Sequence, residues 1–174
     1  MTNYQEPFTF QSGVTVKNRL IMPPMTTLQS FYDGTITNDE INYYAERSHG
    51  VGAVITGAAN VTDMGKGWAG ELSIAHDDDL PGLTKLASAI QAQGAKAFVQ
   101  IFHAGRMSRS DALNGQQALC ASAVAGQHRD GSPKTATPRT MTLNEIHETI
   151  AAFGQATKRA IEAGFDGVEL HGAN

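Results

Sequence analysis

Short apolar runs and longer helical patterns alternate along the chain. The runs at residues 19–22, 53–56, 97–102 and 167–170 are apolar or β-branched and are bounded by Gly or Pro, which is typical of buried strands. Between them, apolar residues recur at helical spacing in residues 38–48, 80–93 and 142–163. Strands that alternate with helices usually pair in parallel, so the pattern predicts an α/β fold with a parallel sheet.

Local signals refine these elements. Thr142 and Glu145 have the spacing of a capping box, which predicts the start of the third helix. Its apolar stripe is expected to run through Ile146, Ile150, Phe153, Ala160 and Ile161. Residues 8–10 and 14–16 flank Gln-Ser-Gly and predict a hairpin ahead of the first strand, where it would plug the bottom of a barrel. Residues 104–141 have little periodicity, and a loop of this length is usually functional or mobile.

Composition narrows the functional classes. The chain has 174 residues, of which 41% are hydrophobic and 17% charged, with a net charge of −4. This apolar content excludes a disordered chain, and the absence of a basic surplus argues against nucleic-acid binding. No run is long enough to predict a membrane span and no secretory signal is visible. The single cysteine, Cys120, excludes an internal disulfide, so a cytoplasmic protein is expected.

Residues able to contact a ligand recur where the predicted strands end. These ends contain Pro-Pro-Met-Thr-Thr at 23–27, Gly-Ala-Ala-Asn at 57–60, Gln100 with His-Ala-Gly-Arg at 103–106, and His-Gly-Ala-Asn at 171–174. Because ligands of parallel α/β folds gather at the carboxyl ends of the strands, these residues predict one pocket formed by the loops that follow them.

Three motifs resemble the old yellow enzyme family of FMN-dependent ene-reductases. They are Lys-Asn-Arg at 17–19 leading into Pro-Pro-Met-Thr at 23–26, Gln-Ile-Phe-His-Ala-Gly-Arg at 100–106, and Ala-Gly-Phe-Asp-Gly-Val-Glu-Leu-His-Gly-Ala-Asn at 163–174. The resemblance covers residues 7–174 and the N-terminal half of the family. It implies a (β/α)8 TIM barrel, of which residues 1–174 supply the hairpin and roughly the first four strands. We therefore expect the native chain to be longer, and the half alone to associate through its open edges.

The resemblance also implies site residues. Pro24, Met25 and Thr26 would line the flavin ring, and the Ala58 backbone and Gln100 amide would meet its pyrimidine edge. His171, which also borders the cofactor, and Asn174 would donate hydrogen bonds to the carbonyl oxygen of the substrate. Two fixed donors stabilise the negative charge that grows there during hydride transfer.

The implied activity is an NAD(P)H-dependent, FMN-containing oxidoreductase that reduces the C=C bond of α,β-unsaturated carbonyl compounds. Its partners would be small electrophilic alkenes and NADH or NADPH, with no nucleic acid or membrane and with self-association possible. Dienoyl-CoA reductases and amine dehydrogenases, which add an iron–sulfur cluster, share this barrel and form one alternative. A non-catalytic half-barrel is the other.

Several polar residues have simpler explanations. His76 and residues 77–79 suit a helix start better than a metal site, and no metal site is predicted. Glu169 is expected to pair with Arg19 or Arg106 as part of the scaffold. Trp68 is expected to pack within its loop.

Overall fold

A parallel sheet forms the centre of the molecule. The computed structural model describes residues 3–173. Strands β3 (Ile21–Met22), β4 (Ala53–Asn60), β6 (Lys96–Phe102) and β9 (Gly167–Leu170) lie in the order β3-β4-β6-β9, and β5 (Leu72–Ser73) also pairs with β4. All these pairs are parallel. The predicted α/β fold is therefore confirmed, with β5 as an additional strand.

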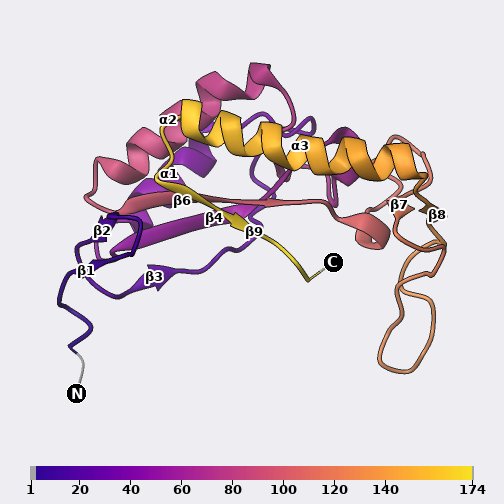
Figure 1. The fold of residues 1–174 in the computed structure, drawn as a ribbon, viewed down its shortest axis with the longest axis horizontal. Coiled ribbons are helices and arrows are strands. Elements are labelled where there is room, and N and C mark those ends of the chain that lie inside the picture. Colours follow the sequence, from indigo (N-terminus) through magenta and orange to yellow (C-terminus); the bar gives the residue numbers. More distant parts are fainter. Residues whose placement is uncertain (1–2, 174) are drawn as a thin grey trace.

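Three helices cover one face of the sheet (Figure 1). They are α1 (Asn38–Arg47), α2 (Leu80–Gln91) and α3 (Leu143–Glu162), and each precedes a strand. Thr37 caps α1 through its side chain, and Thr142 and Glu145 form the predicted capping box of α3. The main core lies between helices and sheet, and its largest members include Tyr44, Ile74, Leu83, Leu86, Ile90, Val99 and Ile101.

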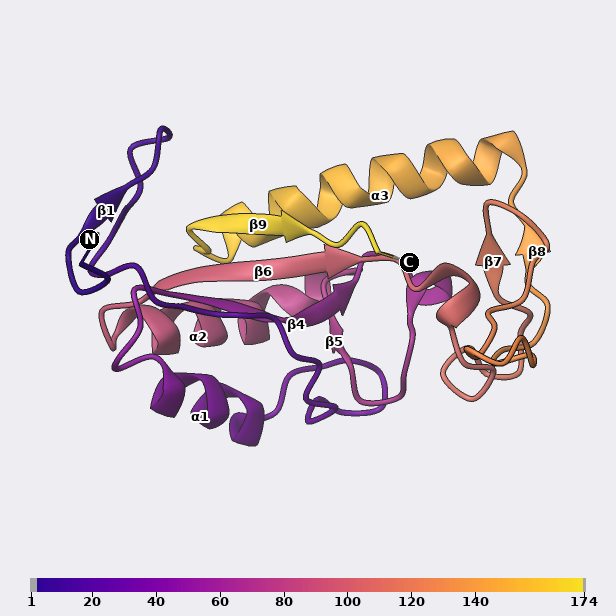
Figure 2. The same cartoon turned by 90° about the horizontal axis from the view of Figure 1, so that it is seen from below.

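The two ends of the sheet carry different structures. The hairpin of β1 (Phe8–Thr9) and β2 (Thr15–Val16) is antiparallel, as predicted, and lies at the amino end of the sheet, opposite the end to which the arrows of β4 and β6 point (Figure 2). The carboxyl end holds the segment at 104–141, which includes a 3-10 turn at Gly105–Met107 and the paired strands β7 (Leu119–Cys120) and β8 (Arg139–Thr140). Two further 3-10 turns, Asp63–Gly65 and Asp77–Asp79, follow β4 and precede α2.

The apolar stripe predicted for α3 does not bury as expected. The buried residues of this helix are Ala156 and Ala160, whereas Ile150 and Ile161 are 65% and 69% exposed. Two other members of the predicted stripe do pack, since Ala160 is buried and the partly buried Phe153 contacts the core. Within residues 3–173 no strand follows β9 at its outer edge. The helix and part of its stripe are therefore confirmed, whereas the burial expected of Ile150 and Ile161 is wrong.

No helix within residues 3–173 is long and apolar enough to cross a membrane.

Candidate functional site

The register of the strands brings the predicted polar residues into two neighbouring rows. Ala58 pairs with Gln100, which pairs with Glu169. In the next row, two residues closer to the carboxyl ends of the strands, Asn60 pairs with Phe102. The ring centroids of Phe102 and His171 lie 5.8 Å apart.

Alternation along the strands turns both rows away from the helices. The intervening residues Ala59, Val99 and Ile101 belong to the core under the helices, so their neighbours face the opposite side of the sheet. That side carries no helix (Figure 1), and the two rows lie at its carboxyl end.

The segment after β3 joins this site through a close backbone approach. A Cβ atom on Gly57 would lie 2.6 Å from the Met25 carbonyl oxygen and 2.9 Å from the Thr26 Cα atom. Glycine at position 57 therefore lets the chain at 25–26 lie directly against β4, next to Ala58. Pro24 is half-buried, and Met25 and Thr26 are exposed.

A β-bulge in β4 determines where Ala58 lies. The register between β4 and β6 shifts between Ile55 and Ala58, so the two residues between them oppose Val99 alone. Tyr44, a buried residue of α1, accepts a hydrogen bond from the Gly57 N–H at 2.6 Å. Thr56 Oγ1 accepts the Gln100 N–H at 3.4 Å. These contacts stabilise a bend that carries β4 to Asn60, beyond its predicted end at Thr56.

Gln100 has the features of a ligand-binding amide. Its side chain is 6% exposed, and among residues 3–173 no partner hydrogen-bonds its amide group. Its amide atoms are not among the side-chain atoms that are fully buried without a hydrogen-bond partner, so a ligand can reach them from the side of the sheet that carries no helix. The amide also both donates and accepts, so a planar heterocycle with adjacent N–H and C=O groups would satisfy it.

His171 follows β9 and presents a donor nitrogen. The Ala173 N–H donates to His171 Nδ1 at 3.3 Å. In the neutral ring this bond places the proton on Nε2, which is then the donor. Asn174, the other predicted donor, lies outside the described residues.

The predicted pairing of Glu169 is wrong. Glu169 Oε2 is buried without a hydrogen-bond partner within residues 3–173. Arg19 instead places its guanidinium 4.8 Å from the centroid of the Phe8 ring, and Arg106 is exposed. Side chains alternate along β9, and the expectation that the Glu169 carboxylate faces away from the helices is correct. The two arginines, however, lie away from it.

The loop after β4 contains a buried carboxylate that sequence reasoning missed. Glu71 is 0% exposed and accepts hydrogen bonds from the backbone N–H groups of Gly67 and Trp68, at 3.1 to 3.2 Å. Burial raises its pKa to about 8, although these two N–H groups and nearby Lys66 oppose the shift. A glutamate in the Gly-rich run 65–71 was the available signal. Burial also lowers the pKa of His103, which accepts the Gly105 N–H on Nδ1.

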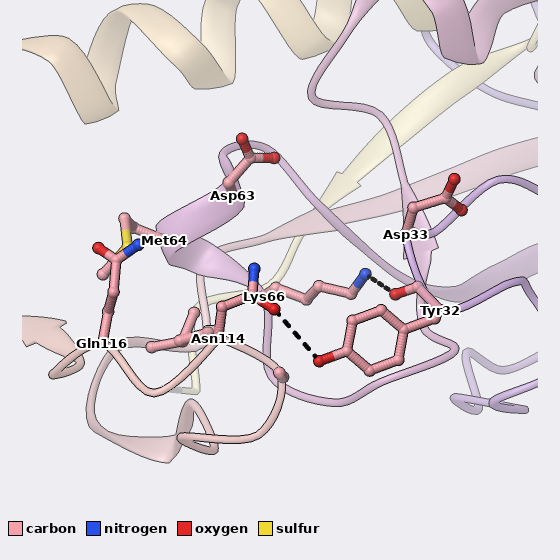
Figure 3. Close-up of a pocket in the computed structure, with 9 residues that line it drawn as sticks. Tyr32, Asp33, Asp63, Met64, Lys66, Asn114 and Gln116 are labelled. Atoms are coloured by element: carbon pink, nitrogen blue, oxygen red, sulfur yellow. Dashed lines mark hydrogen bonds between the residues drawn. The ribbon is translucent and has the colours of Figure 1, made fainter.

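A separate cavity of about 230 Å³ lies among the loops that follow β3, β4 and β6 (Figure 3). Lys66 crosses it and donates to the Tyr32 carbonyl oxygen, and burial lowers the pKa of its ammonium group. None of the predicted site residues lines this cavity. The cavity is therefore distinct from the two rows of paired residues, which lie on the face of the sheet that carries no helix (Figure 1).

The site residues fit a flavin in chemical character. Pro24 and Met25 offer apolar contact to a flat ring, and the Ala58 backbone and the Gln100 amide offer polar groups to its edge. His171 adds a donor in the neighbouring row. The structure thus places Met25 and Thr26 beside β4, pairs Ala58 with Gln100, and places His171 next to Phe102 in the neighbouring row; their roles toward a flavin stay predictions.

Comparisons with known proteins find similar flavin oxidoreductases. Residues 5–174 match the model of the "NADH:flavin oxidoreductase / NADH oxidase family". The chain is 50% identical over 169 residues to "Probable NADH-dependent flavin oxidoreductase YqiG" of Bacillus subtilis (strain 168), covering 97% of this chain and 44% of the relative. It is 49% identical over 174 residues to "NADH:acrylate oxidoreductase" of Vibrio harveyi, covering 100% of this chain and 17% of the relative.

Solved structures give the same fold. Morphinone reductase in complex with tetrahydroNAD superposes with a TM-score of 0.87 at 30% identity, over 100% of this chain and 50% of that one. The old yellow enzyme homologue from Zymomonas mobilis also gives 0.87 at 30% identity, over 98% and 48%. The chain therefore spans half or less of the length of these relatives and matches the N-terminal portion of their TIM-barrel fold.

Proposed function

Because the chain belongs to the NADH:flavin oxidoreductase / NADH oxidase family, we propose that it contributes to an FMN-dependent enzyme that reduces activated C=C bonds. The observation that carries this proposal is the pair of adjacent rows. The Gln100 amide, which has no hydrogen-bond partner within residues 3–173, lies one row from a histidine whose Nε2 is a donor in the neutral ring. The first suits the edge of a flavin and the second suits the carbonyl oxygen of an electrophilic alkene.

The residues have distinct tasks in this reaction. Bound FMN, after reduction by NADH or NADPH, supplies the hydride for the β-carbon of the alkene. Gln100 and the Ala58 backbone would hold the polar edge of the ring, and Pro24 and Met25 would line it. Thr26, exposed beside Gly57, offers a hydroxyl at the edge of the ring.

His171 stabilises the charge that develops on the substrate. As hydride adds to the β-carbon, negative charge grows on the carbonyl oxygen, and the Nε2–H group of His171 donates to it. Asn174 adds a second donor, a role that rests on the family resemblance. A fixed donor of this kind contributes about 2.7–4 kcal/mol to the transition state.

We further propose that residues 1–174 form the first part of one FMN-binding barrel. β3 and β9, at the two ends of the strand order, each pair on one side within residues 3–173. Ile150, Ile161 and Leu170 are exposed apolar residues at the β9 side. A further strand and helix packed there would cover them. We call the FMN-loaded protein that includes the rest of this barrel the holoprotein.

The substrate that we propose is a chemical class, and it is not the compound in the name of any relative. NADH:acrylate oxidoreductase matches this chain over only 17% of its own length. The substrate in its name therefore belongs to a protein with much additional chain. The chemistry of the site supports an alkene conjugated to a carbonyl group.

A flavin half-reaction assay tests the proposal. Anaerobic NADH or NADPH should bleach the flavin absorbance of the holoprotein, and an enone such as 2-cyclohexenone should restore it. A holoprotein that binds FMN and is reduced by NAD(P)H, but is reoxidised by no enone, would contradict alkene reduction. Failure to bind FMN would contradict the cofactor itself.

A further inference from the structure

The rings of Trp68, Phe102 and His171 are neighbours in that order. His171 is the predicted hydrogen-bond donor to the substrate. The rings of Trp68 and Phe102 are parallel within 8°, with centroids 6.4 Å apart. Phe102 is 1% exposed, and its centroid lies 5.8 Å from that of His171 at an interplanar angle of 57°. Both distances fall in the range where aromatic pairs attract each other.

The backbone beneath Trp68 is held in place. Its N–H and that of Gly67 donate to the Glu71 carboxylate. A Cβ atom on Gly67 would lie 3.1 Å from Glu71 Oε2 and 3.2 Å from the Ala104 Cβ atom. Gly70 has a φ of 79° and approaches the Leu28 carbonyl oxygen closely. The indole therefore extends from a backbone with little freedom to move.

Trp68 also closes the outer side of the Phe102 cluster. Phe102, Ala58 and Ala104 are buried together, and the partly buried Trp68 packs against them. Phe102 has no polar atom in its side chain, so its ring orientation depends on packing alone. Removing the indole would leave space into which the Phe102 ring could turn.

His171, by contrast, has weak local support. Its backbone N–H donates to the Ile101 carbonyl oxygen of β6 at 3.1 Å, but within residues 3–173 its ring makes a single hydrogen bond, 3.3 Å long, from the Ala173 N–H. The Phe102 ring is the aromatic side chain next to the imidazole. The direction of the Nε2–H bond thus depends on the position of the Phe102 ring.

We propose that Trp68 is a positioning residue for His171 and acts through Phe102. Trp68 holds the phenyl ring, and the phenyl ring holds the imidazole in the orientation in which Nε2 donates to the substrate oxygen. The functional part of this inference rests on the proposed function. The ring-to-ring coupling does not, because it concerns contacts between side chains.

The test compares three substitutions in the holoprotein. Trp68→Ala removes the ring, Trp68→Phe keeps a smaller one, and Phe8→Ala removes an aromatic ring in the hairpin at the opposite end of the sheet. The readouts are the dissociation constant of a phenol, the rate of flavin reoxidation by 2-cyclohexenone, and the ¹⁵N signals of the His171 ring.

Trp68→Ala should weaken phenol binding and slow reoxidation by roughly 10-fold, below the 10²-fold that a displacement of about 1 Å can cost. Trp68→Phe should recover most of both losses, and Phe8→Ala should change neither. FMN stoichiometry should stay at the wild-type value. In a His171→Ala background, Trp68→Ala should have no further effect.

Additive effects of the two substitutions would overturn the proposal, because they would show that Trp68 does not act through His171. An unchanged His171 ¹⁵N spectrum in Trp68→Ala would also overturn it. If the wild-type holoprotein reduces no enone, the proposed reaction fails. The ¹⁵N spectra of the three variants still decide whether Trp68 orients the histidine.

Discussion

Replacing Glu71 with Gln should flatten the pH dependence of stability. The folded protein raises the pKa of Glu71 from 4.5 to about 8, chiefly because the carboxyl group is buried. Between these values the folded state keeps a proton that the unfolded chain has lost. The stabilisation is therefore complete below pH 4.5 and decreases as the pH rises through about 8.

The magnitude follows from proton linkage. While the folded state binds one more proton than the unfolded chain, the free energy of unfolding falls by about 1.4 kcal/mol per pH unit. Between pH 6 and pH 8 the curvature near the folded pKa reduces the total to about 2 kcal/mol. Glu71→Gln cannot titrate, so its free energy of unfolding should lack this decrease.

The assay uses the protein's single tryptophan. Trp68 donates its backbone N–H to Glu71, so its emission should report both urea unfolding and the native-state titration. Urea curves of both proteins between pH 6 and pH 9 give the difference in free energy. The pKa of His103 is also lowered, but its titration contributes equally to both proteins and cancels in the difference. The titration of Lys66 cancels in the same way, except for the part that depends on the charge of Glu71.

A difference that stays constant between pH 6 and pH 8 would refute the reasoning. It would mean that the N–H groups of Gly67 and Trp68 keep the buried carboxylate ionised. A native-state emission change near pH 8 that persists in Glu71→Gln would assign that titration to another group.

The other predictions concern the two rows and the sheet. Gln100→Leu should raise the dissociation constant of FMN or shift its reduction potential, because the ring edge loses a matched partner in a dry site; unchanged binding and potential would contradict its role. His171→Ala should slow enone-dependent reoxidation by roughly 10²–10³-fold and weaken phenol binding, and full activity in the variant would show that the histidine is structural. Gly167→Ala should cost about 1–3 kcal/mol in urea unfolding, because its Cβ atom would lie 2.6 Å from the Phe98 ring. Gly154→Ala adds a Cβ atom with nothing within 4 Å inside α3 and should stabilise the protein by up to about 1 kcal/mol, because alanine favours a helix; a Gly167→Ala variant as stable as the wild type would exclude the clash.

The sequence by itself determined the order of elements and the residues at the strand ends. Alternating short apolar runs and capped helical patterns depend on local chemistry, so the four parallel strands, three helices and hairpin are predictable. Gln100 and His171 could be placed at carboxyl ends because parallel strands all end on the same side of the sheet. Thr142 and Glu145 identified the start of the third helix, because the contacts of a capping box join residues only three positions apart in the sequence.

Tertiary structure alone decided which of these residues touch. The bulge that carries β4 beyond Thr56 depends on Tyr44, a residue of another element. The neighbours of Trp68 and the burial of Glu71 depend on loops that meet only after the sheet forms. Tertiary packing likewise decided that Ala156, Ala160 and Phe153 of α3 meet the core, while Ile150 and Ile161 stay exposed. Contacts of this kind join segments distant in the sequence, and no local period or cap encodes their geometry.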